Sequence, residues 1–234
     1  MRKGIALSIC LSIMTWVLLQ PKPLLRWIAE RDPRVLYYVQ TSERLVALTI
    51  DDGPHPTVTP MILRVLSKYH AHATFFLIGE RVQKNEGIVH QILSEGHEIG
   101  NHMMTDATSI RLPAAAFEDQ LLRADRLLSR FAAARWFRPG SARYNERMLR
   151  QVKRQNYRCV IGSVFPYDTH VPSVRFQSAF ILSKVFPGSI VILHEGDIGR
   201  KRVAQVLDDV IPQLQSRGYR VVSLSELVEA QCGS

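Results

Sequence analysis

Short apolar segments and segments of helical periodicity alternate along residues 45–230, and this alternation restricts the fold more than any other feature. The apolar runs are rich in β-branched residues, which predicts strands, and the segments between them repeat apolar residues at helical spacing. Predicted strands cover 45–50, 73–78, 97–100, 136–137, 157–163, 189–193 and 219–221; predicted helices cover 57–69, 86–95, 113–131, 145–155, 172–185, 201–216 and the residues from 223 onward. About seven consecutive β/α units predict a parallel barrel or an open parallel sheet.

The first predicted strand, Leu45–Ile50, runs directly into two adjacent aspartates, Asp51 and Asp52, and then into a Gly53-Pro54 turn. Successive strand residues point to opposite faces, so the two carboxylates are expected to have different surroundings and different roles. Read in isolation, the same four residues are also typical of a polar turn that closes a strand.

Polar residues follow five of the predicted strands. They are Asp51-Asp52, His102 with Asp106, Arg138, Tyr167-Asp168 and His194-Glu195. Because the carboxyl ends of parallel strands meet on one face, five such clusters predict a single site there.

His102 and Asp106 are four residues apart, a spacing that places both side chains on one side of a helical turn. With Asp52 from the first strand they would supply three ligands of a divalent ion and leave a position open for water. Such a pair is also common as a capping or surface hydrogen bond.

His194 ends the most hydrophobic predicted strand, opposite the paired aspartates. A histidine there is either a satisfied core residue or a general acid. Arg138 would hold Asp51 ionised and oriented.

Five motifs run in a fixed order through residues 44–230. They are Leu48-Thr49-Ile50-Asp51-Asp52-Gly53-Pro54, Ala73-Thr74-Phe75-Phe76-Leu77-Ile78-Gly79, Gly96-His97-Glu98-Ile99-Gly100-Asn101-His102, Phe137-Arg138-Pro139 and Ile192-Leu193-His194. In this order they resemble the polysaccharide deacetylases of carbohydrate esterase family four (NodB-homology domains). The resemblance implies a distorted (β/α)7-type barrel with parallel strands and metal-dependent removal of acetyl groups from sugars. It also implies that Asp51 is the general base, Asp52 and His102 are metal ligands, Arg138 orients the base and His194 is the general acid.

The chain departs from the family pattern in three places. Asp106 stands where the family's metal motif has a second histidine, and the segment Arg138–Tyr144 replaces the family's Arg-Pro-Pro-Tyr-Gly. By position, the oxyanion donor would be the backbone N–H of Ser141, helped by Tyr144. The family's Asp-rich segment with tryptophan is replaced by residues 163–168, of which Asp168 is the expected partner of His194.

The aspartate at position 106 affects the expected metal. Two carboxylates and one neutral imidazole cancel the charge of a divalent ion, which makes its bound water less acidic. Oxygen ligands also move the preference from zinc toward harder ions. Zinc is the expected ion, with manganese, cobalt or nickel as alternatives, and the reaction would depend more on Asp51 as base.

The N-terminal residues have the pattern of a targeting segment. Arg2-Lys3 precede an apolar run over residues 5–19, which predicts a signal anchor or a signal peptide over residues 1–20. The absence of a small-x-small cleavage site favours the anchor, and a buried first helix is the other alternative. Residues 21–43 are predicted to be a linker or collar before a deacetylase domain over residues 44–230. The positive flank would remain cytoplasmic, which places the domain outside the cytoplasm. There it would be either membrane-anchored or periplasmic or secreted.

Composition adds limits on partners. Lys and Arg outnumber Asp and Glu by 30 to 21, and residues 135–158 carry eight basic residues against one acid, Glu146. Such a segment suits an anionic polymer or lipid headgroups, or is a solvated helix face. We find no nucleic-acid motif, and three cysteines at scattered positions form neither a metal motif nor a disulfide framework.

The predicted function is deacetylation of an N-acetylated glycan such as chitin or peptidoglycan. Two alternatives remain: a catalytically silent relative that binds glycan, and an amidase of the same mechanism that acts on a non-carbohydrate amide. The oligomeric state is not predicted.

Overall fold

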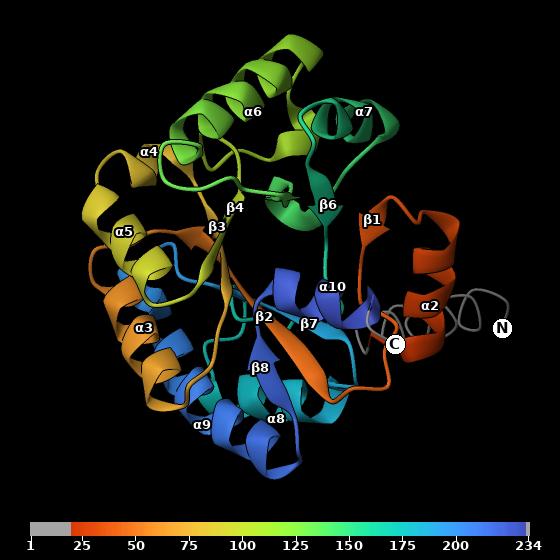
Figure 1. Cartoon of the computed structure of the whole chain (residues 1–234), viewed down its shortest axis with the longest axis vertical. Helices are drawn as coiled ribbons and strands as arrows, with labels where there is room; N and C mark the ends of the chain where they lie inside the picture. Colours follow the sequence, from red (N-terminus) through yellow and green to blue (C-terminus); the bar gives the residue numbers. More distant parts are fainter. Residues whose placement is uncertain (1–19, 233–234) are drawn as a thin grey trace, which may run out of the picture. The chain divides into compact units, whose positions relative to one another are not determined.

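A single sheet of eight parallel strands forms the centre of the protein, shown in the computed structural model of Figure 1, which describes residues 20–232. The strands are β1 (Val35–Leu36), β2 (Leu45–Gly53), β3 (Thr74–Leu77), β4 (Glu98–Asn101), β5 (Trp136–Phe137), β6 (Arg158–Val160), β7 (Ser189–His194) and β8 (Arg220–Val222). Their order is β1-β6-β5-β4-β3-β2-β7, with β8 paired to β2. The predicted parallel α/β fold is therefore confirmed.

The sheet curves into a distorted barrel. Beyond β6, Val164 forms a parallel bridge with Val191 of β7, and the N–H groups of Ser163 and Val164 donate to the Ile190 carbonyl. These contacts join the β6 side of the sheet to β7. The closure is irregular because a short extended segment, rather than a full strand, makes it.

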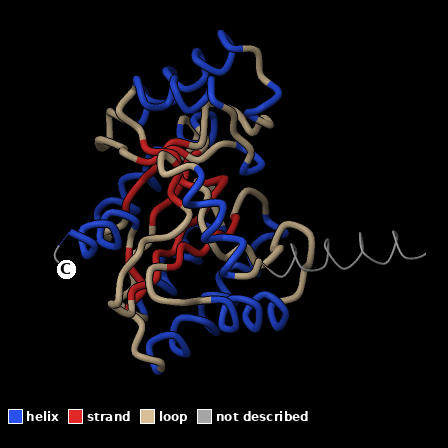
Figure 2. The backbone as a smooth tube through the Cα atoms, turned by 90° about the vertical axis from the view of Figure 1, so that its right-hand side faces the viewer, coloured by secondary structure: helices blue, strands red, loops and turns tan. Residues whose placement is uncertain are grey.

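Helices lie outside the strands in the unit that covers Arg34–Ser234 (Figure 2). They are α3 (Val58–Lys68), α4 (Gly79–Val82), α5 (Glu86–Ser94), α6 (Ala114–Leu128), α7 (Glu146–Arg154), α8 (Val174–Lys184), α9 (Arg202–Ser216) and α10 (Leu224–Cys232). Three short 3-10 turns, η1 (Ser109–Arg111), η2 (Gly140–Ala142) and η3 (Ile198–Lys201), follow β4, β5 and β7. Each turn belongs to a loop that leaves the carboxyl end of a strand.

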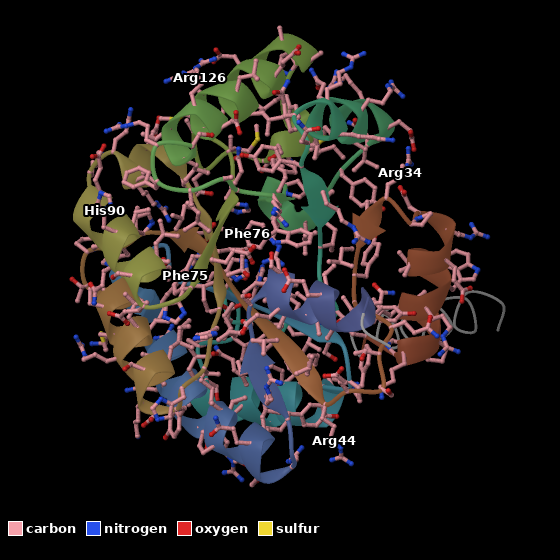
Figure 3. All side chains as sticks on the ribbon, viewed as in Figure 1. Arg34, Arg44, Phe75, Phe76, His90 and Arg126 are labelled. Atoms are coloured by element: carbon pink, nitrogen blue, oxygen red, sulfur yellow. The ribbon has the colours of Figure 1, made fainter. Side chains whose placement is uncertain are left out.

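Strand β2 is buried along its whole length because it pairs with β3, β7 and β8 and is apolar on both faces. Val46, Leu48 and Ile50 pack into one hydrophobic cluster, and the alternate residues Leu45 and Ala47 pack into another. The same alternation places the neighbours Phe75 and Phe76 of β3 in different clusters, and both rings lie in the interior (Figure 3). This packing fixes the positions of the strand ends.

The sheet begins before the predicted domain start at residue 44. Strand β1 pairs with β6, and Tyr38 forms a bridge with Ser189 of β7. Residues 35–38 are thus part of the sheet and not of a linker. The two buried apolar residues Val35 and Leu36 form the edge strand beside β6.

The other compact unit, Met1–Pro33, contributes one described helix, α2 (Lys22–Arg31), in which the Arg31 guanidinium lies 3.8 Å from the centre of the Trp27 ring. Residues 1–19, which carry most of the predicted anchor, lie outside the described residues. Among residues 20–232, no helix has the length and apolar character needed to cross a membrane.

Candidate active site

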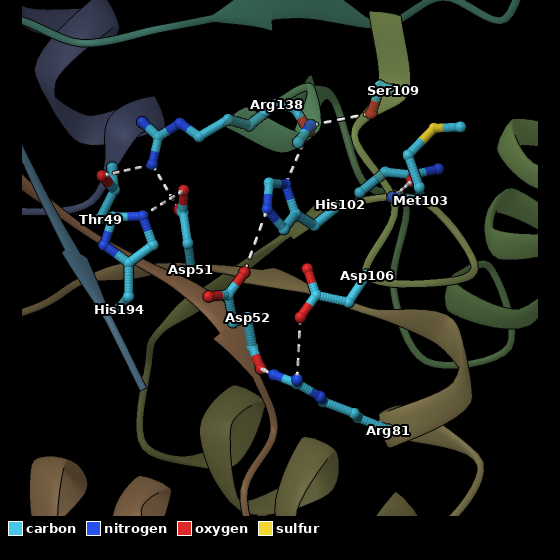
Figure 4. A network of polar contacts seen from close by, with 12 residues as sticks. Thr49, Asp51, Asp52, Arg81, His102, Met103, Asp106, Ser109, Arg138 and His194 are labelled. Atoms are coloured by element: carbon cyan, nitrogen blue, oxygen red, sulfur yellow. Dashed lines mark hydrogen bonds and ion pairs between the residues drawn. The ribbon is translucent and has the colours of Figure 1, made fainter. Parts of the chain in front are cut away.

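A buried ion pair between Asp51 and Arg138 lies at the carboxyl end of the sheet (Figure 4). The Arg138 Nη1 atom lies 2.5 Å from Asp51 Oδ1 and 2.8 Å from the Thr49 hydroxyl oxygen, and Nε donates to the Val160 carbonyl at 3.2 Å. The guanidinium also lies 4.2 Å from the centre of the Phe76 ring. Because the two side chains are only 2% and 4% exposed, each charge depends on the other for stabilisation.

An irregularity in β2 brings both aspartates to the same site. The pairing with β3 shifts register between Asp51 and Gly53, and Asp52 has a left-handed backbone with φ 67°. Such bulges redirect side chains at the ends of strands. The two carboxylates have the different surroundings that the sequence predicts, with Arg138 beside Asp51 and His102 beside Asp52, but the bulge lets both reach one site.

His102, directly after β4, faces Asp52. Its Nε2 atom lies 3.3 Å from Asp52 Oδ1, and its Nδ1 atom lies 2.7 Å from the Arg138 carbonyl oxygen. A carbonyl can only accept, so Nδ1 carries a hydrogen and Nε2 is the atom directed at the carboxylate. A metal-binding histidine is usually held in this way, with its other nitrogen bonded to a carbonyl. The pair therefore fits a divalent cation.

Electrostatics favour a positive charge between these two groups. Burial opposes protonation of His102, but the hydrogen bond to Asp52 and the charges of Asp51 and Asp52 raise its pKa above the ordinary value. Burial likewise opposes ionisation of Asp52, but His102, His194 and Arg200 together lower its pKa. The site thus stabilises a cation beside the Asp52 carboxylate.

Asp106 does not lie on a helical turn with His102. Residues 102–108 are irregular and Met103 has φ 70°, so the predicted turn is wrong. The Asp106 carboxylate is 66% exposed, and its Oδ2 atom lies 3.3 Å from Arg81 Nη2, close to the site in Figure 4. Within residues 20–232, no three His, Cys, Asp or Glu side chains are arranged to hold a metal ion. Ligation by Asp106 remains a prediction.

His194, at the end of β7, completes the constellation. Its Nδ1 atom lies 3.1 Å from Asp168 Oδ1, and its main-chain N–H donates to Asp168 Oδ2 at 2.7 Å. Its Nε2 atom lies 3.9 Å from Asp51 Oδ2. Burial opposes protonation, but the Asp168 hydrogen bond and the surrounding carboxylates raise the pKa of His194. The structure therefore brings together the predicted partners Asp168 and His194.

Comparisons with known proteins identify this arrangement. The sequence family described as polysaccharide deacetylase matches residues 38–160. A peptidoglycan-N-acetylglucosamine deacetylase of Bacillus cereus is 37% identical over 213 residues, which cover 88% of this chain and 98% of the relative. The chain belongs to the polysaccharide deacetylase family.

Solved structures of a peptidoglycan deacetylase and of an acetyl xylan esterase share the fold. The crystal structure of the Bc1960 peptidoglycan N-acetylglucosamine deacetylase, in complex with an N-hydroxybenzamide compound, superposes with a TM-score of 0.80 at 32% identity over 84% of this chain and 93% of that chain. A family four acetyl xylan esterase of Clostridium thermocellum, solved with a cobalt ion, gives a TM-score of 0.73 at 30% identity over 79% and 90% of the two chains. Metal dependence is thus a property of the family.

Two arginines that sequence analysis missed contact the predicted metal ligands of this polysaccharide deacetylase. Arg81 of α4 donates to the main-chain carbonyl of Asp52 and contacts Asp106. Arg200 of η3 places Nη1 2.5 Å from Asp52 Oδ2 and Nε 3.2 Å from Asp197 Oδ2. Neither belongs to a periodic pattern, because both lie in short helical turns after strands. Their only sequence signal is their position shortly after family motifs.

Glu195, which the sequence places in the polar cluster after β7 without assigning it a role, contacts the strand that carries the aspartates. Its Oε2 atom accepts from the Thr59 hydroxyl at 2.5 Å, and its main-chain N–H donates to the Asp51 carbonyl at 3.0 Å. A Cβ atom at Gly53 would lie 2.0 Å from Glu195 Oε1, so a larger residue there would have to displace the Glu195 carboxylate. Burial raises the pKa of Glu195 to about 8, with a further contribution from Asp52. Its position directly after His194 was the available signal.

The loop after β5 carries the predicted oxyanion and substrate residues. Ser141 is exposed with φ 62°, and the Tyr144 hydroxyl lies 2.8 Å from the Tyr37 hydroxyl. Gly140 accounts for one departure from the family motif, since a Cβ atom there would lie 2.5 Å from the Ala107 carbonyl oxygen. The roles of Ser141 and Tyr144 as oxyanion and substrate contacts remain predictions.

Proposed function

We propose that this chain is a metal-dependent hydrolase that removes the acetyl group from N-acetylated sugars of an envelope glycan, with the N-acetylglucosamine of peptidoglycan as the first candidate. One observation carries the proposal: His194 Nε2, held by Asp168, lies 3.9 Å from Asp51 Oδ2, held by Arg138, beside the Asp52–His102 pair. An acid and a base on either side of a cation site suit amide hydrolysis.

Asp52 and His102 would hold the divalent ion, with Asp106 as the third ligand after its carboxylate leaves Arg81. When bound, the ion supplies Lewis-acid polarisation of the acetyl carbonyl. Zinc is the first candidate. Manganese, cobalt and nickel are the alternatives, because a ligand set with more oxygen than nitrogen moves the preference away from zinc.

Asp51 acts as the general base. Arg138 and Asp51 Oδ1 are 2.5 Å apart, which leaves Oδ2 on the His194 side to accept the proton of an attacking water molecule. The buried guanidinium keeps the carboxylate ionised and fixes its direction, so the base needs no reorganisation before the reaction.

His194 acts as the general acid. Its Nδ1–H is directed at Asp168, so Nε2 faces the site and its raised pKa keeps a proton there. As the carbon–nitrogen bond breaks, that proton moves to the leaving sugar amine, and acetate is released with the oxygen from water. The backbone N–H of Ser141 is the proposed donor to the oxyanion, with Tyr144 beside the substrate.

The proposal can be tested by measuring acetate release from peptidoglycan fragments and from N-acetylglucosamine oligomers. Each metal is added in turn to protein that has been treated with a chelator. Asp51→Asn keeps the shape of the base and removes its basicity, so activity should fall about 10²–10⁴-fold. Asp119→Asn, a change to an exposed carboxylate on α6, should leave activity unaltered. Equal rates for the wild type and Asp51→Asn would refute the proposal.

The ion pair between Arg200 and Asp52 favours one alternative, a catalytically silent glycan-binding protein, because the guanidinium already neutralises the metal-binding carboxylate. Titration with zinc and manganese separates the two functions. Glycan binding without metal uptake supports the silent protein, and metal uptake supports the hydrolase.

We also propose an extracytoplasmic location, with residues 1–20 as a membrane anchor, on the basis of the Arg2-Lys3 flank and the apolar run that follows it. The location can be tested by fractionating cells that express the full chain. Protease treatment of intact cells or spheroplasts then shows whether the domain is accessible from outside. A protein that remains in the cytosolic fraction contradicts it.

A further inference from the structure

The excess positive charge of the whole chain comes from one segment, residues 123–158. This segment holds eleven of the 30 Lys and Arg residues and two of the 21 Asp and Glu residues. The remaining 19 basic and 19 acidic residues balance each other, so the net charge of +9 belongs to this segment alone. Such segregation is a feature of surfaces that attract polyanions.

The segment folds onto one side of the barrel. It forms the second half of α6, strand β5, helix α7 and the start of β6. Helices α6 and α7 are neighbours in Figure 1, and the Gln151 amide of α7 donates to the Ala114 carbonyl and to Glu118 of α6 at 3.2 Å each. Basic residues of both helices therefore lie on the same side of the barrel.

Helix α7 separates its apolar and basic residues. Met148, Leu149 and Val152 are buried, whereas Arg150, Lys153 and Arg154 are exposed. On α6, Arg126 is exposed and projects outward in Figure 3. We call these four residues, Arg126, Arg150, Lys153 and Arg154, the basic face.

Little acidic charge compensates the basic face. Within residues 20–232, Arg126, Lys153 and Arg154 form no ion pair; Arg150 lies 3.9 Å from Glu146. The Glu146 carboxylate is already held by Arg34, at 2.5 and 2.8 Å. Four cations are thus available to an external anion.

The chemistry of the segment indicates the kind of partner. Three of the four residues of the basic face are arginine, whose planar guanidinium pairs bidentately with phosphate or carboxylate groups. Within residues 20–232, the large exposed hydrophobic side chains are Trp27 and Phe176, and both lie outside the segment. A membrane-binding surface usually adds apolar side chains that enter the lipid, so a polymer fits this face better than a bilayer does.

We infer that the basic face binds a linear anionic polymer with repeated phosphate or carboxylate groups. The loop after β5 carries Ser141 and Tyr144, and helix α7 begins two residues after Tyr144. A polymer on the basic face would therefore lie beside the proposed acetyl-binding region. The face would concentrate the enzyme on glycan that carries, or lies next to, such polymers. Binding itself does not depend on the proposed catalytic function.

The inference can be tested by binding fluorescently labelled inorganic polyphosphate to the full chain. Fluorescence anisotropy measures the affinity over a range of salt concentrations. The variant Arg150→Gln/Lys153→Gln/Arg154→Gln should bind at least about tenfold more weakly and with a smaller salt dependence, because fewer counterions are released. The control Arg64→Gln/Lys84→Gln/Arg220→Gln removes the same three charges at exposed positions on α3, after α4 and on β8. It should bind as the wild type does.

Two results would overturn the inference. One is an equal loss of affinity in the control variant, which would mean that net charge alone drives binding. The other is binding to phosphatidylglycerol vesicles but not to polyphosphate, which would assign the face to a lipid surface. Measurement in the Asp51→Asn background separates this test from catalysis, and both triple variants should deacetylate neutral oligomers at the wild-type rate.

Discussion

The Nη1 atom of Arg200 lies 2.5 Å from Oδ2 of Asp52, the carboxylate predicted to bind the metal. The other oxygen of Asp52 faces His102 at 3.3 Å, so both carboxylate oxygens already have positively charged or proton-bearing partners. A divalent ion that binds Asp52 therefore competes with the chain's own guanidinium. Arg200 belongs to the loop after β7, and so metal binding is coupled to the position of this loop.

Arg200→Gln should tighten metal binding. The side chain of Arg200 is 25% exposed and that of Asp52 is 11% exposed, and loss of a partly exposed ion pair of this kind corresponds to about two- to fivefold in affinity. Titration of zinc and manganese against a fluorescent chelator measures the change. Lys201→Gln, an exposed neighbour, is the control and should bind metal as the wild type does. An unchanged affinity in Arg200→Gln would contradict competition.

Removal of Arg138 should destabilise the fold strongly. In Arg138→Met the Asp51 carboxylate stays buried without its ion pair, which costs about 3–5 kcal/mol. Urea unfolding with added chelator measures the loss. The double variant Arg138→Met/Asp51→Asn should recover part of it, since neither charge of the pair then remains buried. A double variant less stable than Arg138→Met would show that packing of the guanidinium, rather than the charge, dominates.

Asp168→Asn should shift the pH dependence of the reaction. Burial alone would lower the pKa of His194, and the Asp168 hydrogen bond and charge reverse this. As a general acid, His194 loses activity when pH rises through its pKa. The variant lowers that pKa, so the alkaline limb of the rate profile should move to lower pH. An NMR titration of the imidazole checks the same shift without turnover, and Asp119→Asn should leave both curves in place.

Glu195→Gln should change the pH dependence of stability. Burial raises the pKa of Glu195 from the ordinary 4.5 to about 8 in the folded state. A raised pKa means that the folded state holds a proton that the unfolded state releases. The stabilisation is therefore full below pH 4.5 and is lost as pH rises through about 8, with a slope of up to about 1.4 kcal/mol per pH unit.

Unfolding free energies measured near pH 5, 7 and 9 with chelator present test this expectation. The wild type should lose stability relative to Glu195→Gln across that range, because the amide cannot titrate and still reaches the Thr59 hydroxyl. Parallel stability curves for the two proteins would show that Glu195 does not titrate in this range.

Positions of strands and helices followed closely from the amino-acid pattern. Every predicted strand from residue 45 onward is present, as the boundaries of β2 and β7 illustrate, because each strand is short, apolar and bounded by turn residues. The short strand β1 was not predicted, since two apolar residues form no pattern and only the partner strand β6 makes them a strand.

The acid–base and metal-binding candidates were also readable from the sequence. Asp51 and His194 lie at the carboxyl ends of β2 and β7, and His102 and Arg138 directly follow β4 and β5. The carboxyl ends of parallel strands meet on one face, independently of the loop conformations. The partner Asp168 was identified by position alone, and its contact with His194 depends on how the loop after β6 folds back.

Tertiary structure alone decided the contacts that tune this site. The bulge that turns Asp52 toward His102, the irregular loop that places Asp106 against Arg81, and the approach of Arg200 to Asp52 all depend on bulges, loops and short helical turns at the strand ends. Sequence periodicity describes only regular strands and helices. The conformation of such loops is set by packing against the neighbouring strand ends, and so the residues that compete for the Asp52 carboxylate become visible only in the folded chain.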